Sequence, residues 1–328
     1  MTMGRLLPAF LAQSILHGLI AAVFVETVLR AWRVEDASWR VRLRFLPLLF
    51  PIVALPVLFL LAPWRNDPSF IGRRALFASE RWNLLHVSGV GLGDLVLLLA
   101  AGLGAALFLR DAVPPILDLL RAGHRAADVG PWLAGSTSVT TAVETHARVL
   151  GIAPPPVRVI RLTAPVLLCE GARRPTLVIS PSTMARLPAA ELNAALAHEL
   201  AHAAYRDPAW GYVLIALRVV LFLNPAAQWT ARAVVDDMER RADQLAVRLV
   251  GDPNALARAI EILFDAGQAQ PVETDSSLER LFWKARRAGV ARRCRRLRAT
   301  APGVPTGGGP LTLALAALGI ALLVFFSV

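Results

Sequence analysis

Residues 188–205 read PAAELNAALAHELAHAAY, a stretch that contains His198, Glu199 and His202. Proline is favoured in the first turn of a helix, and Pro208 follows the stretch, so the sequence predicts one helix here. Histidines four residues apart lie one turn above each other on the same face, where both imidazoles can reach a single ion. The stretch therefore predicts a metal-binding helix.

Glu199 lies between the two histidines and supplies a group that peptide hydrolysis needs. Its carboxylate can polarise a metal-bound water and act as general base. Zinc suits this donor set, because neutral imidazole is a good ligand for it and a fourth position stays open for water. A surface helix can carry the same pattern by chance, so the assignment needs a third ligand.

A second helix is predicted over residues 225–250, ended by Gly251. It contains the stretch MERRAD at 238–243, in which Glu239 and Asp243 are four residues apart and share one face. Zinc peptidases with a glutamate ligand take it from a downstream helix, so we expect Glu239 to bind the metal. Asp243 is expected to orient one imidazole from behind. The competing interpretation of Glu239 and Asp243 is an exposed, charged helix face.

The composition is that of a membrane protein. Hydrophobic residues make up 55% of the chain and charged residues 18%, which is richer in apolar residues than soluble domains are. The long apolar runs are each about long enough to cross a hydrocarbon core as a helix. These runs are 6–29, 45–62, 84–109 and 311–328. The first can also be interpreted as a signal peptide, but its length and the lack of a clear cleavage site favour a retained helix.

The formal net charge of +11 points to a negatively charged partner. The densest basic stretch runs from Arg280 to Arg298, just before the last apolar run. Basic residues in this position are typical of the cytoplasmic side of a membrane and bind anionic lipid. Direct nucleic-acid binding is not expected, because the stretch has few aromatic residues and contains no recognisable nucleic-acid module. The two cysteines are too few for a disulfide framework or a cysteine metal site.

The segment before the histidine helix is predicted to be a small α+β region. An amphipathic helix is expected over 138–150, and short strands are expected over 157–160, 166–169 and 176–179. The last of these strands is expected to offer an edge on which an extended substrate pairs.

A further apolar stretch, 209–223, lies between His202 and Glu239. If it crossed the membrane once, the two halves of the metal site would lie on opposite sides of the bilayer. One ion cannot bridge that distance, so the stretch is predicted not to span the membrane. Arg218 within it and the Asn224-Pro225 break agree with this prediction. The alternative is a true span, which would exclude a shared zinc site.

The histidine motif, followed by the Glu-x-Ala-Asp stretch, resembles membrane gluzincin peptidases. Two branches are similar: the antirepressor metallopeptidases that accompany beta-lactam sensing, and the HtpX and CAAX-prenyl-protease branch. The stretches APVLLCEG at 164–171 and PTLVISP at 175–181, together with Asn224-Pro225 and Asp207, resemble the antirepressor branch. The resemblance implies a zincin-like catalytic domain, one Zn²⁺ per chain and a further supporting carboxylate at Asp207.

The chain departs from the antirepressor pattern in two places. Ala242 stands where that branch often has cysteine, and the chain ends just after its last apolar run. The extracellular penicillin-binding sensor domain of the family is therefore expected to be absent, and beta-lactam sensing by this chain is not expected.

These features predict a mainly α, multi-pass membrane protein with a zincin-like α+β catalytic domain built on a small β-sheet and two metal-binding helices. Three transmembrane helices are expected over 1–110. A cytoplasm-facing zinc metallopeptidase domain is expected over 111–300, and a linker with a last transmembrane helix over 301–328. The expected location is a bacterial cytoplasmic membrane.

Three functions are compatible with these predictions. The first is a regulatory protease that cuts a protein substrate, with a transcriptional repressor or a membrane protein as candidates. The second is an HtpX-like quality-control or processing peptidase. The third is a catalytically idle membrane scaffold that retains zinc. Glu199 argues against the third, because a purely structural site needs no general base.

Overall fold

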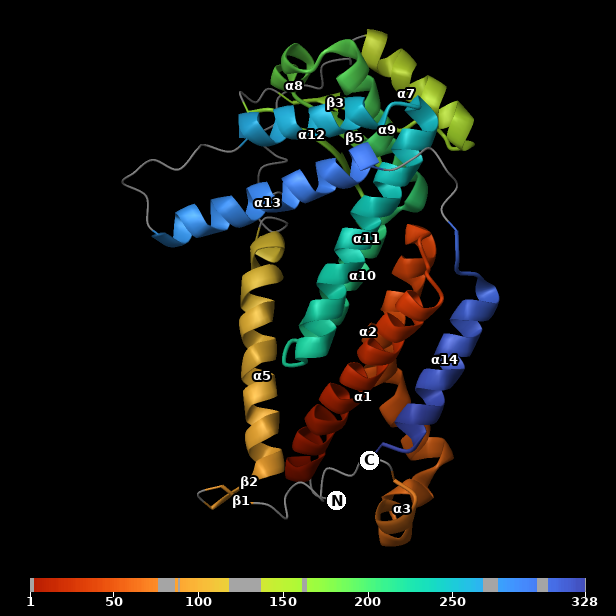
Figure 1. Cartoon of the computed structure of the whole chain (residues 1–328), viewed down its shortest axis with the longest axis vertical. Coiled ribbons are helices and arrows are strands. Elements are labelled where there is room, and N and C mark those ends of the chain that lie inside the picture. The colour runs from red at the N-terminus through yellow and green to blue at the C-terminus, as the bar shows by residue number, and fades with distance from the viewer. Residues whose placement is uncertain are drawn as a thin grey trace. The chain divides into compact units, whose positions relative to one another are not determined.

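The computed structural model describes residues 3–75, 86–87, 89–117, 137–160, 164–267, 277–299 and 306–327 (Figure 1). The chain divides into two compact units. The helical unit comprises Met1–Ala122, Val213–Met238 and Pro305–Val328, and the peptidase unit comprises Gly123–Tyr212 and Glu239–Val304. Each unit is described separately.

The helical unit has a core of three packed helices. These are α1 (Met3–Ala31), α2 (Ala37–Leu61) and α14 (Pro310–Phe325). Buried residues from all three form one cluster, with Val25, Leu43 and Ile320 among its members. Asp36 begins α2, because its carboxylate accepts hydrogen bonds from the backbone N–H groups of Ser38 and Trp39.

Between residues 63 and 111 the described elements are short, apart from α5 (Leu92–Asp111). They are a 3-10 turn (Pro63–Asn66), α3 (Pro68–Arg73) and the antiparallel pair β1 (His86–Val87) and β2 (Val90–Gly91). Residues 86–87 and 90–91 of the apolar run predicted over 84–109 are therefore a strand pair, whereas residues 84 and 85 lie outside the described residues. Gly89, with a φ of 84°, forms the turn between the strands, and the helix starts only at Leu92.

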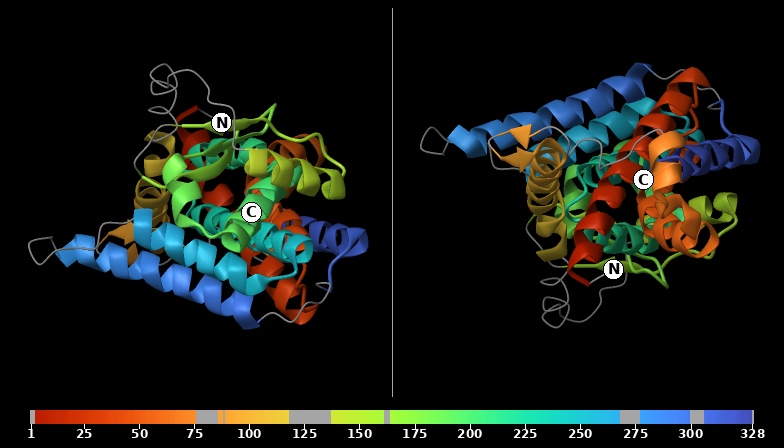
Figure 2. Two further views of the ribbon diagram at one scale, coloured as in Figure 1. Left: turned by 90° about the horizontal axis from the view of Figure 1, so that it is seen from above. Right: turned by 90° about the horizontal axis from the view of Figure 1, so that it is seen from below.

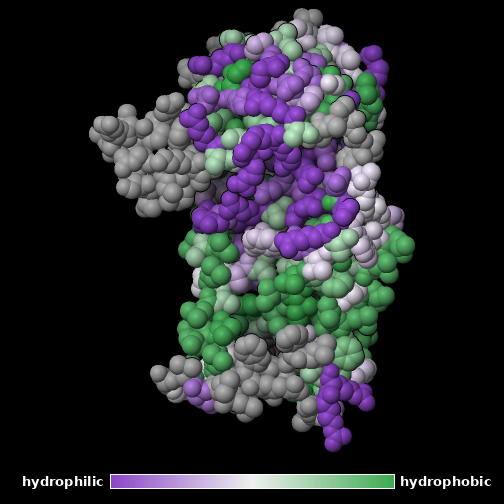
Figure 3. Space-filling model, viewed as in Figure 1, coloured by the Kyte–Doolittle hydropathy of each residue, from purple (hydrophilic) through white to green (hydrophobic). Residues whose placement is uncertain are grey.

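Two helices in the described part of the chain are long and apolar enough to cross a membrane, Phe10–Ala31 within α1 and the whole of α5. A shorter apolar helix, α14, has 16 residues. On the face shown in Figure 3, hydrophobic side chains cover α5, where Leu98, Leu99 and Leu103 are exposed. Such an exposed apolar surface suits a lipid environment.

The predicted non-spanning stretch forms one arm of a helical hairpin. It corresponds to α10 (Asp207–Val220), and after a turn at residues 221–224 the chain continues as α11 (Pro225–Val250). Across the turn, Arg218 donates to the Gln228 side-chain oxygen at 3.0 Å, and the Gln228 amide donates back to the Arg218 carbonyl at 3.0 Å. The chain therefore reverses direction between His202 and Glu239.

The peptidase unit contains a three-stranded sheet and the helices around it. The strands are β3 (Val157–Val159), β4 (Leu167–Glu170) and β5 (Thr176–Ile179), in the order β3-β5-β4. Central β5 pairs parallel with β3 and antiparallel with β4. The prediction that the strand at 176–179 offers a free edge is wrong, because β3 and β4 occupy both of its sides.

The helices of this unit are α7 (Thr137–Leu150), α8 (Pro181–Arg186), α9 (Ala189–Tyr205), α12 (Pro253–Gly267) and α13 (Ser277–Ala299). The sheet and α7 pack on α9 through buried apolar residues such as Val143, Leu177 and Leu200. Both views of Figure 2 show α12 and α13 side by side. Leu256 of α12 and Leu297 of α13 share a second cluster with alanines of α9. The histidine helix is therefore enclosed on several sides.

Candidate metal centre

The histidine helix α9 is held in place by small buried residues. Ala194, Ala197 and Ala201 are almost fully buried, so neighbouring elements approach its backbone closely. The helix ends at Arg206, whose φ of 55° lies in the left-handed region, and α10 begins directly afterwards. Pro208 thus lies in the first turn of α10, where proline is tolerated.

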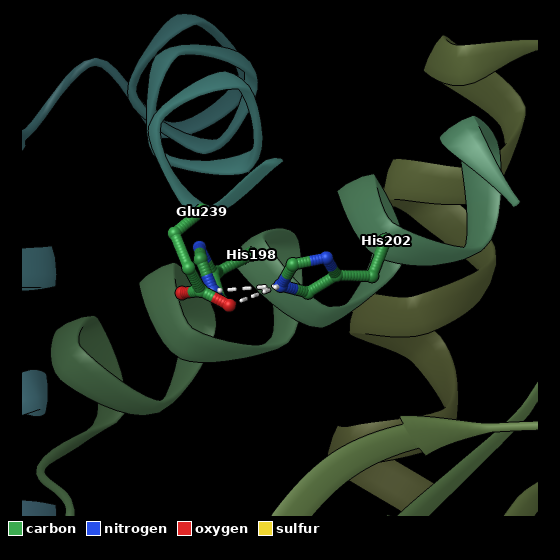
Figure 4. Close-up of side chains that lie close together, drawn as sticks. All are labelled: His198, His202 and Glu239. Carbon is green, nitrogen blue, oxygen red and sulfur yellow. Dashed lines mark hydrogen bonds and ion pairs between the residues drawn. The ribbon is translucent and has the colours of Figure 1, made fainter. Parts of the chain in front are cut away.

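His198 and His202 point their Nε2 atoms at one place (Figure 4). These two atoms are 3.1 Å apart. Glu239 is the first residue of α11 that belongs to the peptidase unit. Its carboxylate lies at the same place as the two Nε2 atoms. Its oxygens lie 3.6 Å from His198 Nε2 and 3.7 Å from His202 Nε2.

The donor set fits a tetrahedral metal ion. Zinc binds imidazole nitrogen and carboxylate oxygen at about 2.1 Å, so two tetrahedral donors should be about 3.4 Å apart. The two Nε2 atoms are 3.1 Å apart, and each has one of the two Glu239 oxygens at 3.6 or 3.7 Å, so these separations lie on either side of that value. His198, His202 and Glu239 are the residues that form a possible metal-holding group in the described part of the chain.

The remaining imidazole nitrogens are each held by a carboxylate. His198 Nδ1 lies 3.2 Å from an Asp243 oxygen, and His202 Nδ1 lies 2.8 Å from an Asp207 oxygen. When each Nδ1–H donates to its carboxylate, the Nε2 lone pair is left facing the metal position. The sequence-predicted Asp243 and Asp207 thus lie where they can fix the tautomer of one histidine each.

Asp207 is itself fixed by a buried ion pair. Its second oxygen accepts a hydrogen bond from Arg241, and both side chains are almost fully buried. The Arg241 guanidinium also lies over the Tyr205 ring, 4.5 Å from its centroid. This chain of contacts joins the end of α9 to α11 and restricts how His202 can turn.

Glu199 lies on the same helix, next to β4. Its carboxylate accepts a hydrogen bond from the backbone N–H of Cys169, a residue of the edge strand. Burial raises the pKa of Glu199 above its ordinary value, while the nearby His198 and His202 act in the opposite direction. A carboxylate in a buried site with a raised pKa is suited to exchanging a proton during catalysis.

The ionisable groups of the centre stabilise one another's charges. Burial disfavours the charged form of His198, but its hydrogen bonds to Asp243 and Glu239 outweigh burial and raise the pKa of His198 to about 10. Burial also opposes ionisation of Glu239 and Asp243, yet His198 and Arg293 keep the pKa of each carboxyl below its ordinary value. Glu239 and Asp243 therefore stay ionised, and their negative charges face the positive charge of Arg293 and favour a proton on His198.

Arg293 is a site residue that the sequence analysis did not single out. It lies on α13, and its guanidinium contacts Glu239 at 2.8 Å and Asp243 at 2.6 Å. By sequence, Arg293 belongs to the arginines of 280–298 that are predicted to bind lipid. The signal that could have separated it is the apolar spacing of Val290, Cys294 and Leu297, which marks the inner face of α13 beside it.

Other arginines of the basic stretch also have protein partners. Arg296 contacts Asp243 at 3.3 Å, and Arg298 contacts Glu261 at 2.7 Å. Arg292 and Arg295 are exposed. The side chains of Arg280, Lys284 and Arg286 lie outside the described residues.

Comparison with known proteins agrees with this geometry. The family model described as BlaR1 peptidase M56 matches residues 158–255, a range that contains β4, β5, α9 and the whole of α11. No curated protein matches the chain. The resemblance to the antirepressor peptidases is thus confirmed, and the matched range includes both histidines and the downstream glutamate. Residues 158–255 are thus similar to the M56 peptidase family, and His198, His202 and Glu239 within that range fit the gluzincin pattern of a metallopeptidase.

Proposed function

We propose that this M56 peptidase is a zinc metalloendopeptidase that cleaves a protein substrate at the cytoplasmic face of a bacterial membrane. The observation that carries the proposal is the convergence of three donor atoms at tetrahedral spacing, with Glu199 on the same helix as two of them. The two membrane-compatible helices support a membrane location.

The residues of the chain divide the work of peptide hydrolysis. His198, His202 and Glu239 would hold the ion, which when bound polarises the scissile carbonyl and lowers the pKa of a water. Glu199 takes the proton of the attacking water and passes it to the leaving amine. Asp243 and Asp207 keep the two imidazoles aligned.

The substrate is proposed to bind along β4. This strand is an edge of the sheet, and its Cys169 N–H contacts Glu199, so an extended peptide paired with β4 would run beside the general base. Main-chain pairing accepts many sequences and explains how such a site can bind a protein segment. β4 thus takes the role that the sequence analysis gave to residues 176–179.

Regulatory proteolysis is the favoured role, with a transcriptional repressor or a membrane protein as substrate. The regulatory role is supported by the match to the family model described as BlaR1 peptidase M56. An HtpX-like quality-control peptidase is the second candidate, and trapped substrates would separate the two. The exposed arginines of α13, such as Arg292 and Arg295, are proposed to contact anionic lipid.

Replacement of the general base provides the direct test. Glu199→Gln keeps the shape of the side chain but cannot accept the proton, so cleavage should fall about 100-fold or more. Bound zinc should remain, because Glu199 is not one of the three donors. The measurement is cleavage of a model protein together with metal content, and the trapped substrates are identified by mass spectrometry.

Glu144→Gln is the matched control, because Glu144 is exposed on α7 in the same unit. It should cleave like the unchanged chain. If Glu199→Gln retained full activity, Glu199 would be ruled out as the general base, and the proposed mechanism would fail. If only its cellular function were retained, the chain would act as a zinc-holding scaffold.

A further inference from the structure

Arg293 is held in position by the packing of α13. Its neighbour Cys294 is 1% exposed and Leu297 is 4% exposed, and both belong to a cluster with alanines of α9, α11 and α12. The inner face of this part of α13 is thus embedded in the peptidase unit. Arg293 stands beside that face and reaches inward, whereas Arg292 and Arg295 are exposed.

The guanidinium of Arg293 joins two carboxylates that lie one turn apart on α11. Its Nε and one terminal nitrogen donate to the two oxygens of Asp243 at 2.9 and 2.6 Å. Its other terminal nitrogen lies 2.8 Å from a Glu239 oxygen. A fork-like contact of this kind fixes both the position and the orientation of the carboxylates.

The same guanidinium also reaches the metal-binding atom of His198. One terminal nitrogen lies 3.2 Å from His198 Nε2. That Nε2 is the atom that lies 3.1 Å from His202 Nε2 and 3.6 Å from Glu239. A fixed positive charge therefore stands beside two of the three metal donors.

A cation in this place opposes a metal ion in two ways. It engages the Glu239 oxygen and the His198 lone pair that the ion needs, and its charge repels the ion at short range. Asp243, which is 3% exposed, is the carboxylate that keeps Arg293 there.

We propose that Arg293 is a positioning residue that sets the metal affinity of the centre by competing with the ion for Glu239 and His198. The two-pronged pair with Asp243 keeps Arg293 attached to α11, while its contact with Glu239 gives way when the ion binds. The fraction of chains that hold a metal ion thereby depends on how α13 packs in the peptidase unit. This inference rests on the proposed zinc site.

Zinc affinity of the purified full-length chain in detergent tests the proposal, measured by competition with a chromophoric chelator. Arg293→Gln removes the charge and should bind zinc about tenfold more tightly or better, the scale on which contacts behind metal ligands act. Arg293→Lys keeps the charge and should stay closer to the unchanged chain. Arg295→Gln, on the exposed side of α13, is the matched control and should not change the affinity.

Two outcomes separate this proposal from a purely structural role. If Arg293 only supported the fold, Arg293→Gln would weaken zinc binding, and that result would overturn the proposal, as would unchanged affinity. If the unchanged chain bound no zinc, the proposed function itself would fail instead.

Thermal unfolding with and without zinc gives a second measurement. Without zinc, Arg293→Gln should unfold at a lower temperature than the unchanged chain, because Glu239 and Asp243 lose a counter-charge. Zinc should raise its midpoint more than that of the unchanged chain, since at one concentration a ligand that binds more tightly stabilises the folded chain more. A smaller zinc-induced rise, or no recovery of fold at any zinc concentration, would contradict the proposal.

Discussion

At the scale of single residues, the contact between Asp207 and His202 can be tested apart from its structural role. Asp207→Asn removes the charge that Arg241 needs, and breaking a buried pair of this kind costs about 3 kcal/mol or more of stability. Zinc affinity should fall about 10-fold to 100-fold, because His202 loses its carboxylate partner. Chemical denaturation and chelator competition measure the two effects.

A double variant separates the two effects of the Asp207 substitution. Asp207→Asn combined with Arg241→Met leaves no unpaired buried charge, so stability should largely return. Zinc affinity should stay low, because the carboxylate beside His202 Nδ1 is still missing. Recovery of both quantities together would show that Asp207 acts only through the fold.

The residues of the centre differ in how far the sequence could predict them. Local spacing on two helices is enough to propose His198, His202, Glu239 and Asp243, since residues four apart share a helix face. Arg293 is different, because nothing near it in sequence shows that α13 packs back onto α9 and α12. Its role depends on contacts between distant segments, which spacing along one helix does not reveal.

At the scale of elements, the hairpin of α10 and α11 meets α5 at a glycine. A Cβ atom added at Gly104 would lie 2.3 Å from the Leu223 carbonyl oxygen, whereas one added at Gly102 would meet nothing within 4 Å. Gly104→Ala should therefore destabilise the helical unit by about 1–3 kcal/mol, the usual cost of overpacking. Gly102→Ala is the control and should be neutral in thermal unfolding in detergent.

Equal stability of the two glycine variants would mean that α5 does not hold the hairpin turn closely. The sequence analysis had placed no weight on Gly104, because close packing of a glycine depends on which backbone faces it. The ends of α9 and α11, by contrast, follow from proline and glycine at their boundaries, and the structure places them within one residue of the prediction. The pairing of β5 on both sides was missed, because strand order depends on contacts that distant segments make.

At the scale of the whole molecule, a single metal site requires that His202 and Glu239 lie on one side of the membrane. The hairpin meets this requirement if α10 enters the bilayer without crossing it. The 14 residues of α10 form a helix about 21 Å long. A hydrocarbon core is about 30 Å thick, so α10 is too short to cross it. Asn224 closes the turn, because its side-chain oxygen accepts from the Ala227 N–H and its amide donates to the Ser14 carbonyl.

Cysteine labelling tests this topology in a background with Cys169 and Cys294 replaced by alanine. Val90→Cys lies before α5, Phe222→Cys lies at the hairpin turn and Asp252→Cys lies in the peptidase unit, and each of these side chains is exposed or partly exposed. With a membrane-impermeant thiol reagent on spheroplasts, position 90 should react. Position 252 should react only after the membrane is opened, because the peptidase unit is proposed to face the cytoplasm.

Position 222 decides between the hairpin and a true span. If α10 dips into the bilayer and returns, a cysteine at 222 is surrounded by lipid and should stay unreactive from both sides. If α10 crosses, position 222 should react from outside together with position 90. That outcome would place the two ends of α10 on opposite faces of the membrane.

In that case α11 would have to cross the membrane again to bring Glu239 back to His198. The 26 residues of α11 are long enough to cross, but the buried ion pair of Asp237 with Arg44 then has to lie within the bilayer, where charged groups are costly. The hairpin avoids that cost by keeping the charged half of α11 near the membrane surface.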